Sequence, residues 1–172
     1  MKKIFLLSMT LFMIFSSSLM AVEKKATKKD NEKNSEKTYV GFGLGLTDAT
    51  GFDTGYSLIL NAGKSLPKVS EDFGVEGTFT RTIVDPSRNN LDLSITTIAG
   101  YATYNFKLTP AVDLKAKGGV LYERLATSVT TDGFEVSFGF KVLYALESKK
   151  SIYLDYTIIE ADIAIFSLGL QF

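Results

Sequence analysis

Hydrophobic and polar residues alternate along most of this chain, with a period of two from Tyr39 onward. Such alternation over a short run predicts a β-strand with one apolar and one polar face. The runs occupy residues 39–47, 54–66, 71–84, 91–108, 111–125, 133–147, 150–159 and 162–172. Pro67, Pro86 and Pro110 all fall between runs, where a residue without a backbone N–H interrupts no ladder. The pattern predicts consecutive antiparallel strands joined by short hairpins.

The composition of the two faces indicates which one points inward. Most runs carry Phe, Tyr, Leu, Ile or Val on one phase, and Gly, Ser, Thr or charged residues on the other. The interior of a barrel of about eight strands is just wide enough for side chains, so glycine and serine fill it more easily than a ring of aromatics. We therefore predict an all-β fold, an eight-stranded antiparallel up-and-down transmembrane β-barrel with its apolar face in lipid. A soluble lipocalin-like lipid carrier is the alternative.

Two runs need comment. Gly41, Gly43 and Gly45 alternate in the first run, without the spacing or the following helix of a phosphate loop, and we expect them to leave room inside the barrel. In the run 91–108, the apolar residues change phase after Ile95. A β-bulge near residues 96–97 would place them on one face. Alternatively, residues 91–95 extend above the membrane.

Charged residues of both signs lie on the inward phase of the third, fifth, sixth and seventh runs. They are Glu76, Asp113, Lys115, Lys117, Glu135, Lys141 and Asp155. Because isolated buried charges cost several kcal/mol each, we expect these side chains to pair in a salt-bridge network inside the barrel. The network would fill the lumen and fix the strand register. A charged constriction that gates small ions is the alternative role.

The ends of the chain predict its location. Residues 1–21 combine Lys2 and Lys3, a short apolar run and a small-residue region, which is typical of a secretory signal peptide. Residues 22–38 are highly charged and are expected to form a disordered periplasmic leader, followed by the barrel over residues 39–172. We expect export to the cell outer membrane. With the leader in the periplasm, the loops near 48–53, 85–90, 126–132 and 160–161 face outside.

The composition leaves little room for catalysis or cofactors. The chain has no histidine and no cysteine, so it can form neither a histidine-based catalytic pair nor a thiolate metal site. Residues 39–172 contain 11 Lys and Arg against 15 Asp and Glu, a net charge of −4, which argues against nucleic acid as a partner. We expect no enzymatic activity, no cofactor and no metal. Loop acids such as Asp48 with Asp53 could hold calcium only weakly.

One cation lies on the lipid-facing phase. Arg81 is near the outer end of the third run, where an arginine costs little because it is close to the interface. It could contact the phosphates of lipopolysaccharide, or simply extend its guanidinium to water.

These features resemble the outer membrane protein β-barrel domains: the barrel of outer membrane protein A, the small X-type barrels and the opacity-like proteins. The resemblance rests on the signal peptide, the first strand YVGFGLGL, the alternating runs and the last strand IAIFSLGLQF. It implies that the terminal strand is read by the barrel assembly machinery, here through Phe166, Leu168, Leu170 and Phe172. We also expect a monomer in contact with outer-membrane lipid and lipopolysaccharide. We expect a small non-enzymatic barrel with a structural or surface-interaction role, or alternatively a low-conductance ion or small-solute channel.

Overall fold

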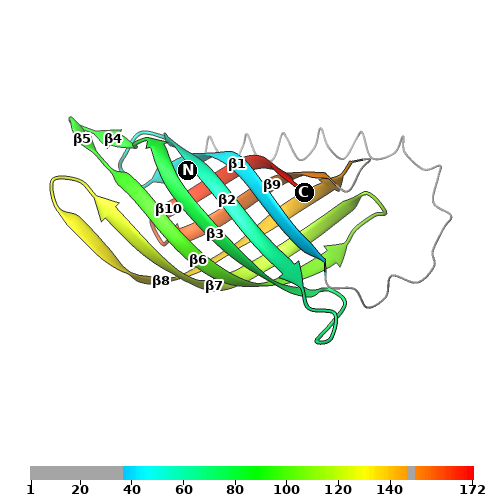
Figure 1. The fold of residues 1–172 in the computed structure, drawn as a ribbon. Coiled ribbons are helices and arrows are strands. Elements are labelled where there is room, and N and C mark those ends of the chain that lie inside the picture. The colour runs from blue at the N-terminus through cyan, green and yellow to red at the C-terminus, as the bar shows by residue number, and fades with distance from the viewer. Residues whose placement is uncertain (1–36, 147–149) are drawn as a thin grey trace. The chain divides into compact units, whose positions relative to one another are not determined.

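The computed structural model describes residues 37–146 and 150–172, and these form a closed β-barrel. Neighbouring barrel strands follow the order β1, β10, β9, β8, β7, β6, β3, β2, and β2 pairs again with β1 (Figure 1). The barrel strands are β1 (Thr38–Ala49), β2 (Gly55–Ser65), β3 (Phe73–Val84), β6 (Ser94–Lys107), β7 (Val112–Ala126), β8 (Thr130–Ala145), β9 (Ser151–Glu160) and β10 (Ile163–Gln171). Two short strands, β4 (Ser87–Arg88) and β5 (Leu91–Asp92), pair only with each other.

The predicted fold class is confirmed, because every neighbouring pair of barrel strands is antiparallel. The loops at one end differ from expectation. Residues 126–132 were predicted as a loop, but β7 continues to Ala126 and β8 begins at Thr130, so the two strands form a long hairpin. This hairpin and the β4–β5 ribbon extend from the same end of the barrel (Figure 1). In the described residues, no helix is long and apolar enough to cross a membrane.

The bulge predicted near residues 96–97 is wrong. β6 pairs in continuous register with β7 on one side, and with β3 from Thr96 onward on the other. Leu93 and Ile95 simply face inward, and Ile95 is completely buried. The register shifts lie elsewhere, at Tyr56/Ser57 and at Ile163/Ala164. The prediction failed because it assumed that apolar residues face lipid, whereas at this end apolar residues also fill the interior.

The two faces of the strands differ in burial as the alternation predicts. On β8, Phe138 is 55% exposed on the outside, whereas the inward residues Ser137 and Lys141 of the same strand are fully buried. The inward glycines of β1 leave room for groups from the next two strands, β10 and β9. A Cβ atom at Gly43 would lie 2.6 Å from the Tyr153 hydroxyl and 2.7 Å from the backbone oxygen of Leu168. Glycine is therefore required there to let Tyr153 cross the lumen.

The interior is divided into an apolar and a charged half. The apolar half lies toward the end with the β7–β8 hairpin and contains Ala49, Ile59, Leu93, Ile95, Ala99, Tyr101, Leu121, Ile159, Ile163 and Ile165. The charged half lies toward the end where the described chain begins and finishes. Side chains therefore fill the lumen in both halves, apolar ones toward one end and charged ones toward the other.

Candidate functional site

The charged half of the lumen is built from three neighbouring strands and one strand across the barrel. Lys115 and Lys117 alternate along β7, so both point inward. Lys141 on β8 lies opposite Lys115 in the ladder and, on its other side, opposite Asp155 on β9. The register thus places two ammonium groups and one carboxylate in a row. Like charges directly opposite each other are unfavourable unless a further anion joins them.

Glu76 on β3 supplies that anion from across the lumen. Its carboxylate accepts hydrogen bonds from Lys141 Nζ at 2.9 Å to each oxygen, and from Lys115 Nζ at 3.3 Å. Lys117 Nζ lies 4.0 Å from Oε1 of the same carboxylate. One buried carboxylate therefore lies at the junction of three cations, and it ties β3 to β7 and β8, neither of which pairs with β3 in the sheet.

Asp155 is the second anion of the network. Lys117 Nζ donates a hydrogen bond to Asp155 Oδ2 at 2.7 Å, and Lys141 Nζ lies 3.5 Å from the same oxygen. The hydroxyl of Thr157 donates to Asp155 Oδ1 at 2.7 Å. Both oxygens of this carboxylate are thus engaged, as a buried charge requires.

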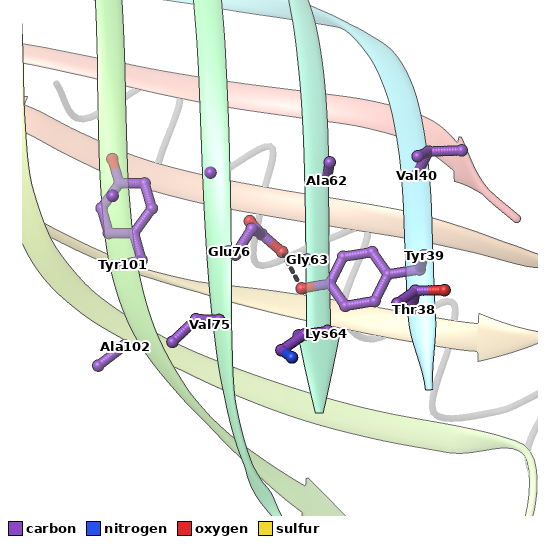
Figure 2. A pocket seen from close by; sticks show the side chains of 12 residues that line it. Thr38, Tyr39, Val40, Ala62, Gly63, Lys64, Val75, Glu76, Tyr101 and Ala102 are labelled. Carbon is purple, nitrogen blue, oxygen red and sulfur yellow. Dashed lines mark hydrogen bonds between the residues drawn. The ribbon is translucent and has the colours of Figure 1, made fainter. Parts of the chain in front are cut away.

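Tyrosines complete the network, and the sequence reasoning missed them. The Tyr39 hydroxyl donates to Glu76 at 2.7 Å and accepts from Lys115 at 2.7 Å. Figure 2 shows the ring of Tyr39 reaching from β1 toward Glu76. The ammonium groups of Lys117 and Lys141 lie 4.9 and 4.8 Å from the ring centres of Tyr101 and Tyr153. Their inward phase was the available signal, since a tyrosine facing a charged lumen can offer both a hydroxyl and a π face.

The network is buried and carries an excess positive charge. The side chains of Glu76 and Lys141 are 0% exposed, and that of Asp155 is 8% exposed. Three lysines face two carboxylates, which gives a formal charge of +1. The aromatic rings around the lysines partly offset this excess. The described contacts within the cluster are ion pairs, hydrogen bonds and cation–π contacts.

Two of the predicted lumenal charges lie apart from this cluster. Asp113 is half-buried near the start of β7 and lies opposite Lys107 of β6 in the ladder. Glu135 is exposed near the outer end of β8, opposite Leu121. Within the described residues, neither side chain forms an ion pair with the cluster. The alternation shows only that both side chains lie on the inward phase. It does not show that Asp113 lies beyond the charged half at one end of the barrel, and Glu135 at the other.

The charged and apolar halves meet at a small cavity. Its volume is about 20 Å³, and its lining includes Lys117, Asp155, Thr78, Ile59 and Ile159. A cavity of this size holds about one water molecule. The Thr78 hydroxyl has no hydrogen-bond partner among the described residues and could bind such a water. The apolar residues that line this cavity, such as Ile59, lie on the inward phase of their strands, where polar residues were expected from the sequence.

The remaining predicted site residues lie on the outer surface. Arg81 on β3 is exposed, and Arg124 on β7 lies on the same face because both are in register with Thr96. The four residues of the expected assembly signal, Phe166, Leu168, Leu170 and Phe172, share the outward phase at the end of the chain. The ring of Phe172 stacks on Phe42 at 6.0 Å. The described residues contain no cluster of three or more acidic side chains that could hold a metal ion.

A shallow depression also lies on the outer wall, over β1, β2, β3 and β6. Its volume is about 710 Å³, and Figure 2 shows small outward side chains such as Ala62 and Ala102 along it, with Lys64 at one end. Gly77 and Gly100 lie opposite each other in its floor. The depression lies on the apolar side of the wall, and Tyr39 and Glu76 of the ion network are among the residues that line it.

Comparisons with known proteins agree with this architecture. No protein with a curated description matches the chain. Among solved structures, neisserial surface protein A superposes with a TM-score of 0.63 at 16% identity, covering 80% of this chain and 98% of that one. Ail, the attachment invasion locus protein of Yersinia pestis, gives 0.54 at 15% identity, covering 80% and 97%.

The N-terminal β-barrel domain of Pseudomonas aeruginosa OprF gives a TM-score of 0.54 at 10% identity, covering 80% of this chain and 98% of that one. At such identities the structural likeness establishes the fold. The family is established by sequence, because the model of the outer membrane protein beta-barrel domain matches residues 8–170. The chain therefore belongs to the outer membrane protein beta-barrel domain family and is a small transmembrane barrel of the outer membrane.

Proposed function

We propose that this protein is a non-enzymatic outer-membrane barrel with a sealed interior and a structural or surface-interaction role. The observation that carries the proposal is the filling of the lumen by two successive layers of side chains. The ion network of Glu76, Lys115, Lys117, Lys141 and Asp155 occupies one half, and the apolar cluster occupies the other. A cavity of about 20 Å³ lies where the layers meet.

The two layers have different physical roles in this proposal. Closed strand pairing satisfies the backbone in lipid, as every membrane-spanning sheet requires. The ion network links β3 to β7, β8 and β9 through charged hydrogen bonds across the lumen, and so fixes their relative position. The apolar layer excludes water from the other half. A solute would have to displace both layers to pass.

A low-conductance channel is the second candidate function. The excess of three lysines over two carboxylates favours it, because a positive constriction would select anions if it opened. In this reading the network would be a gate, and weakening its ion pairs would open the lumen.

Planar-bilayer recordings separate these candidates. The wild type, Glu76→Ala and Lys141→Ala would be compared with Glu71→Ala, whose exposed acid lies in the turn before β3. A sealed structural barrel predicts no unitary steps from the wild type or the control. Reproducible anion-selective steps in the wild type, altered by Lys141→Ala, would replace our proposal with the channel.

The surface-interaction part concerns lipid first. Arg81 and Arg124 lie two strands apart on one row of the outer face, which is about 10 Å at ordinary strand spacing. Two guanidinium groups at this spacing suit the phosphates of lipopolysaccharide, and the exposed position makes their desolvation cheap. We expect Arg81→Ser with Arg124→Ser to weaken binding of purified lipopolysaccharide, whereas Arg88→Ser on the β4–β5 ribbon serves as the matched control. If the Arg81→Ser/Arg124→Ser double variant binds lipopolysaccharide as well as the Arg88→Ser control does, the proposed contact is refuted.

Export and assembly belong to the same proposal. The predicted signal peptide (1–21) and leader (22–38) lie almost wholly outside the described residues. The outward row of Phe166, Leu168, Leu170 and Phe172 presents an apolar edge that an assembly machinery can read, and the protein then acts as a monomer. N-terminal sequencing of the outer-membrane form tests cleavage near residue 21. Deletion of Phe172 should leave unassembled protein in the periplasm, and normal assembly would refute the proposed role.

A further inference from the structure

The cavity where the two halves of the lumen meet is lined mainly by residues that carry a hydroxyl group. Its volume is about 20 Å³, which is room for one particle of about the size of water. Besides three isoleucines, Lys117 and Asp155, the lining consists of Thr78, Thr80, Thr97, Tyr101, Thr157 and Ser167. These hydroxyl residues belong to β3 and β6 on one part of the wall, and to β9 and β10 on another. Hydrogen-bonding groups therefore surround the cavity on more than one side.

One of these hydroxyl groups is not used within the chain. The Thr78 Oγ1 atom is buried and has no hydrogen-bond partner among the described residues. Two of its neighbours are engaged, since Thr157 donates to Asp155 and Tyr101 is hydrogen-bonded to Ser137. A buried hydroxyl without a partner costs free energy, which an acceptor inside the cavity would recover.

The cavity also borders a buried cluster that has one positive charge in excess. Lys117 lines the cavity, and its ammonium belongs to the network of three lysines and two carboxylates. Both oxygens of Asp155, the carboxylate in the lining, already accept hydrogen bonds from Lys117 and Thr157. The buried acid Glu123 is six residues further along β7, about 20 Å from Lys117 at the usual strand rise. The cluster beside the cavity thus keeps its formal charge of +1.

This charge decides which small particle suits the cavity. A water molecule would satisfy the Thr78 hydroxyl but would leave the cluster charged. A cation would increase the excess, and buried charge without a counterion is strongly unfavourable. A monovalent anion would accept a hydrogen bond from Thr78, face the Lys117 ammonium and make the cluster neutral. The other hydroxyl groups can rotate their hydrogens toward it.

We propose that this cavity binds one small monovalent anion of the halide class, such as chloride. The ion acts as the counterion of the lysine cluster and stabilises the folded barrel, so the stability of the protein depends on the halide concentration. The volume of the cavity excludes large anions such as gluconate. This inference goes beyond the structural role proposed above, and it holds whether or not the barrel conducts.

The first test is urea unfolding of the full mature protein, refolded into vesicles in the presence of each salt. Refolding in the salt lets the ion enter before the lumen closes. A ligand that binds only the folded state lowers the unfolding equilibrium constant in proportion to its concentration, once this exceeds Kd. We therefore expect about a tenfold decrease for each tenfold increase in chloride. Sodium gluconate at equal ionic strength should cause no such decrease.

Variants of Thr78 test the hydrogen bond to the ion. Thr78→Val removes the donor and keeps the shape of the side chain, so it should lose most of the chloride dependence. Thr78→Ser keeps the hydroxyl and should keep the dependence. Thr103→Val is the matched control, because Thr103 is also a buried threonine of the lumen but does not line the cavity. It should respond to chloride as the wild type does.

Lys115→Met tests the charge without touching the cavity. Lys115 is absent from the lining, yet its replacement leaves two lysines against two carboxylates. It is two residues from Lys117 on β7, about 7 Å along the strand, so its charge lies within about 10 Å of an ion beside Lys117. At this distance a unit charge changes affinity roughly tenfold at an effective dielectric constant of about 20. The variant should need about ten times more chloride for the same stabilisation.

Bromide locates the site directly. Crystals of protein refolded in sodium bromide should show one anomalous peak in the cavity, between the Thr78 hydroxyl and the Lys117 ammonium. Cavity density without a bromide signal would overturn the proposal, because it would identify a water molecule. Equal stabilisation by gluconate would overturn it as well, and so would an unchanged chloride dependence in Thr78→Val or in Lys115→Met.

Bilayer recordings on the same preparation keep this proposal apart from the sealed lumen. A conducting barrel whose stability depends on chloride refutes only the sealed lumen. A silent barrel whose stability is the same in chloride and gluconate refutes only the ion site.

Discussion

Replacement of Glu76 by glutamine should destabilise the barrel strongly. The Glu76 side chain is fully buried, and its carboxylate lies within 4.0 Å of the ammonium groups of Lys115, Lys117 and Lys141. Glutamine keeps the shape but removes the negative charge. Three cations would then face the single carboxylate of Asp155 inside the lumen. Removal of one partner of a buried ion pair typically costs about 3–5 kcal/mol.

The effect is measurable by urea unfolding in detergent or lipid, followed by circular dichroism and by gel mobility without boiling. With a slope of about 1–3 kcal/mol per molar urea, the expected loss moves the midpoint down by about 1–5 M. Glu71→Gln removes an exposed acid from a turn and serves as the control, with a shift near zero.

A second substitution makes the test specific to charge. Lys141→Gln combined with Glu76→Gln removes one of the stranded cations, so the double variant should be more stable than the sum of the single effects predicts. Contacting charges commonly couple by about 0.5–3 kcal/mol in such a cycle. A Glu76→Gln midpoint equal to that of the Glu71→Gln control, or strict additivity in the cycle, would refute the reasoning.

Three further predictions concern packing and surface. Gly43→Ala should lower stability, because the new Cβ atom would meet the Tyr153 hydroxyl and a backbone oxygen, whereas Gly100→Ala has open space and should fold normally in the same gel assay. Ile95→Ala should cost about 2–5 kcal/mol in urea unfolding because it leaves a cavity in the apolar half; Ile98→Ala, 61% exposed on the outer face, should cost far less, and equal losses would contradict the two-sided wall. Phe172→Ala, which removes the ring, should slow folding of the barrel into vesicles, measured by the rate of the gel shift. An unchanged rate would contradict this prediction.

The sequence predicted the architecture well because a barrel strand encodes its two faces locally. Each inward residue alternates with an outward one, so the strand limits followed from the period and from the positions of proline. The register of Lys141 beside Asp155 was not encoded in this way. It depends on hairpin lengths on both sides of β8, which the alternation does not report.

The composition of the lumen was harder to infer. A polar interior was the expectation, and the apolar half escaped notice because Ile59, Leu121 and Ile165 stand among polar neighbours on the inward phase. The false bulge had the same origin, since Ile95 was assigned to lipid when it belongs to the interior. Hydrophobicity alone cannot distinguish these positions, because both lipid and a dry lumen accept apolar side chains.

The part of β8 that pairs with β7 but not with β9, residues 130–137, also had no signal in the sequence. The run 133–147 alternates as cleanly outside the barrel as within it. Only pairing across β8 and β9, which ends at Phe138 and Ile158, separates the two parts. Pairing partners are a property of the whole barrel, and they appear only when its closure is known.

The central claim is that apolar side chains face lipid while the ionic residues are sealed inside. The chain has no tryptophan, so Phe138→Trp and Tyr153→Trp each introduce one fluorescent reporter, on the outer face of β8 and in the lumen on β9 respectively. In vesicles of lipids brominated on their acyl chains, we predict strong quenching of the reporter at position 138 and little quenching at position 153. Equal quenching at both positions, or the reverse order, would contradict the account.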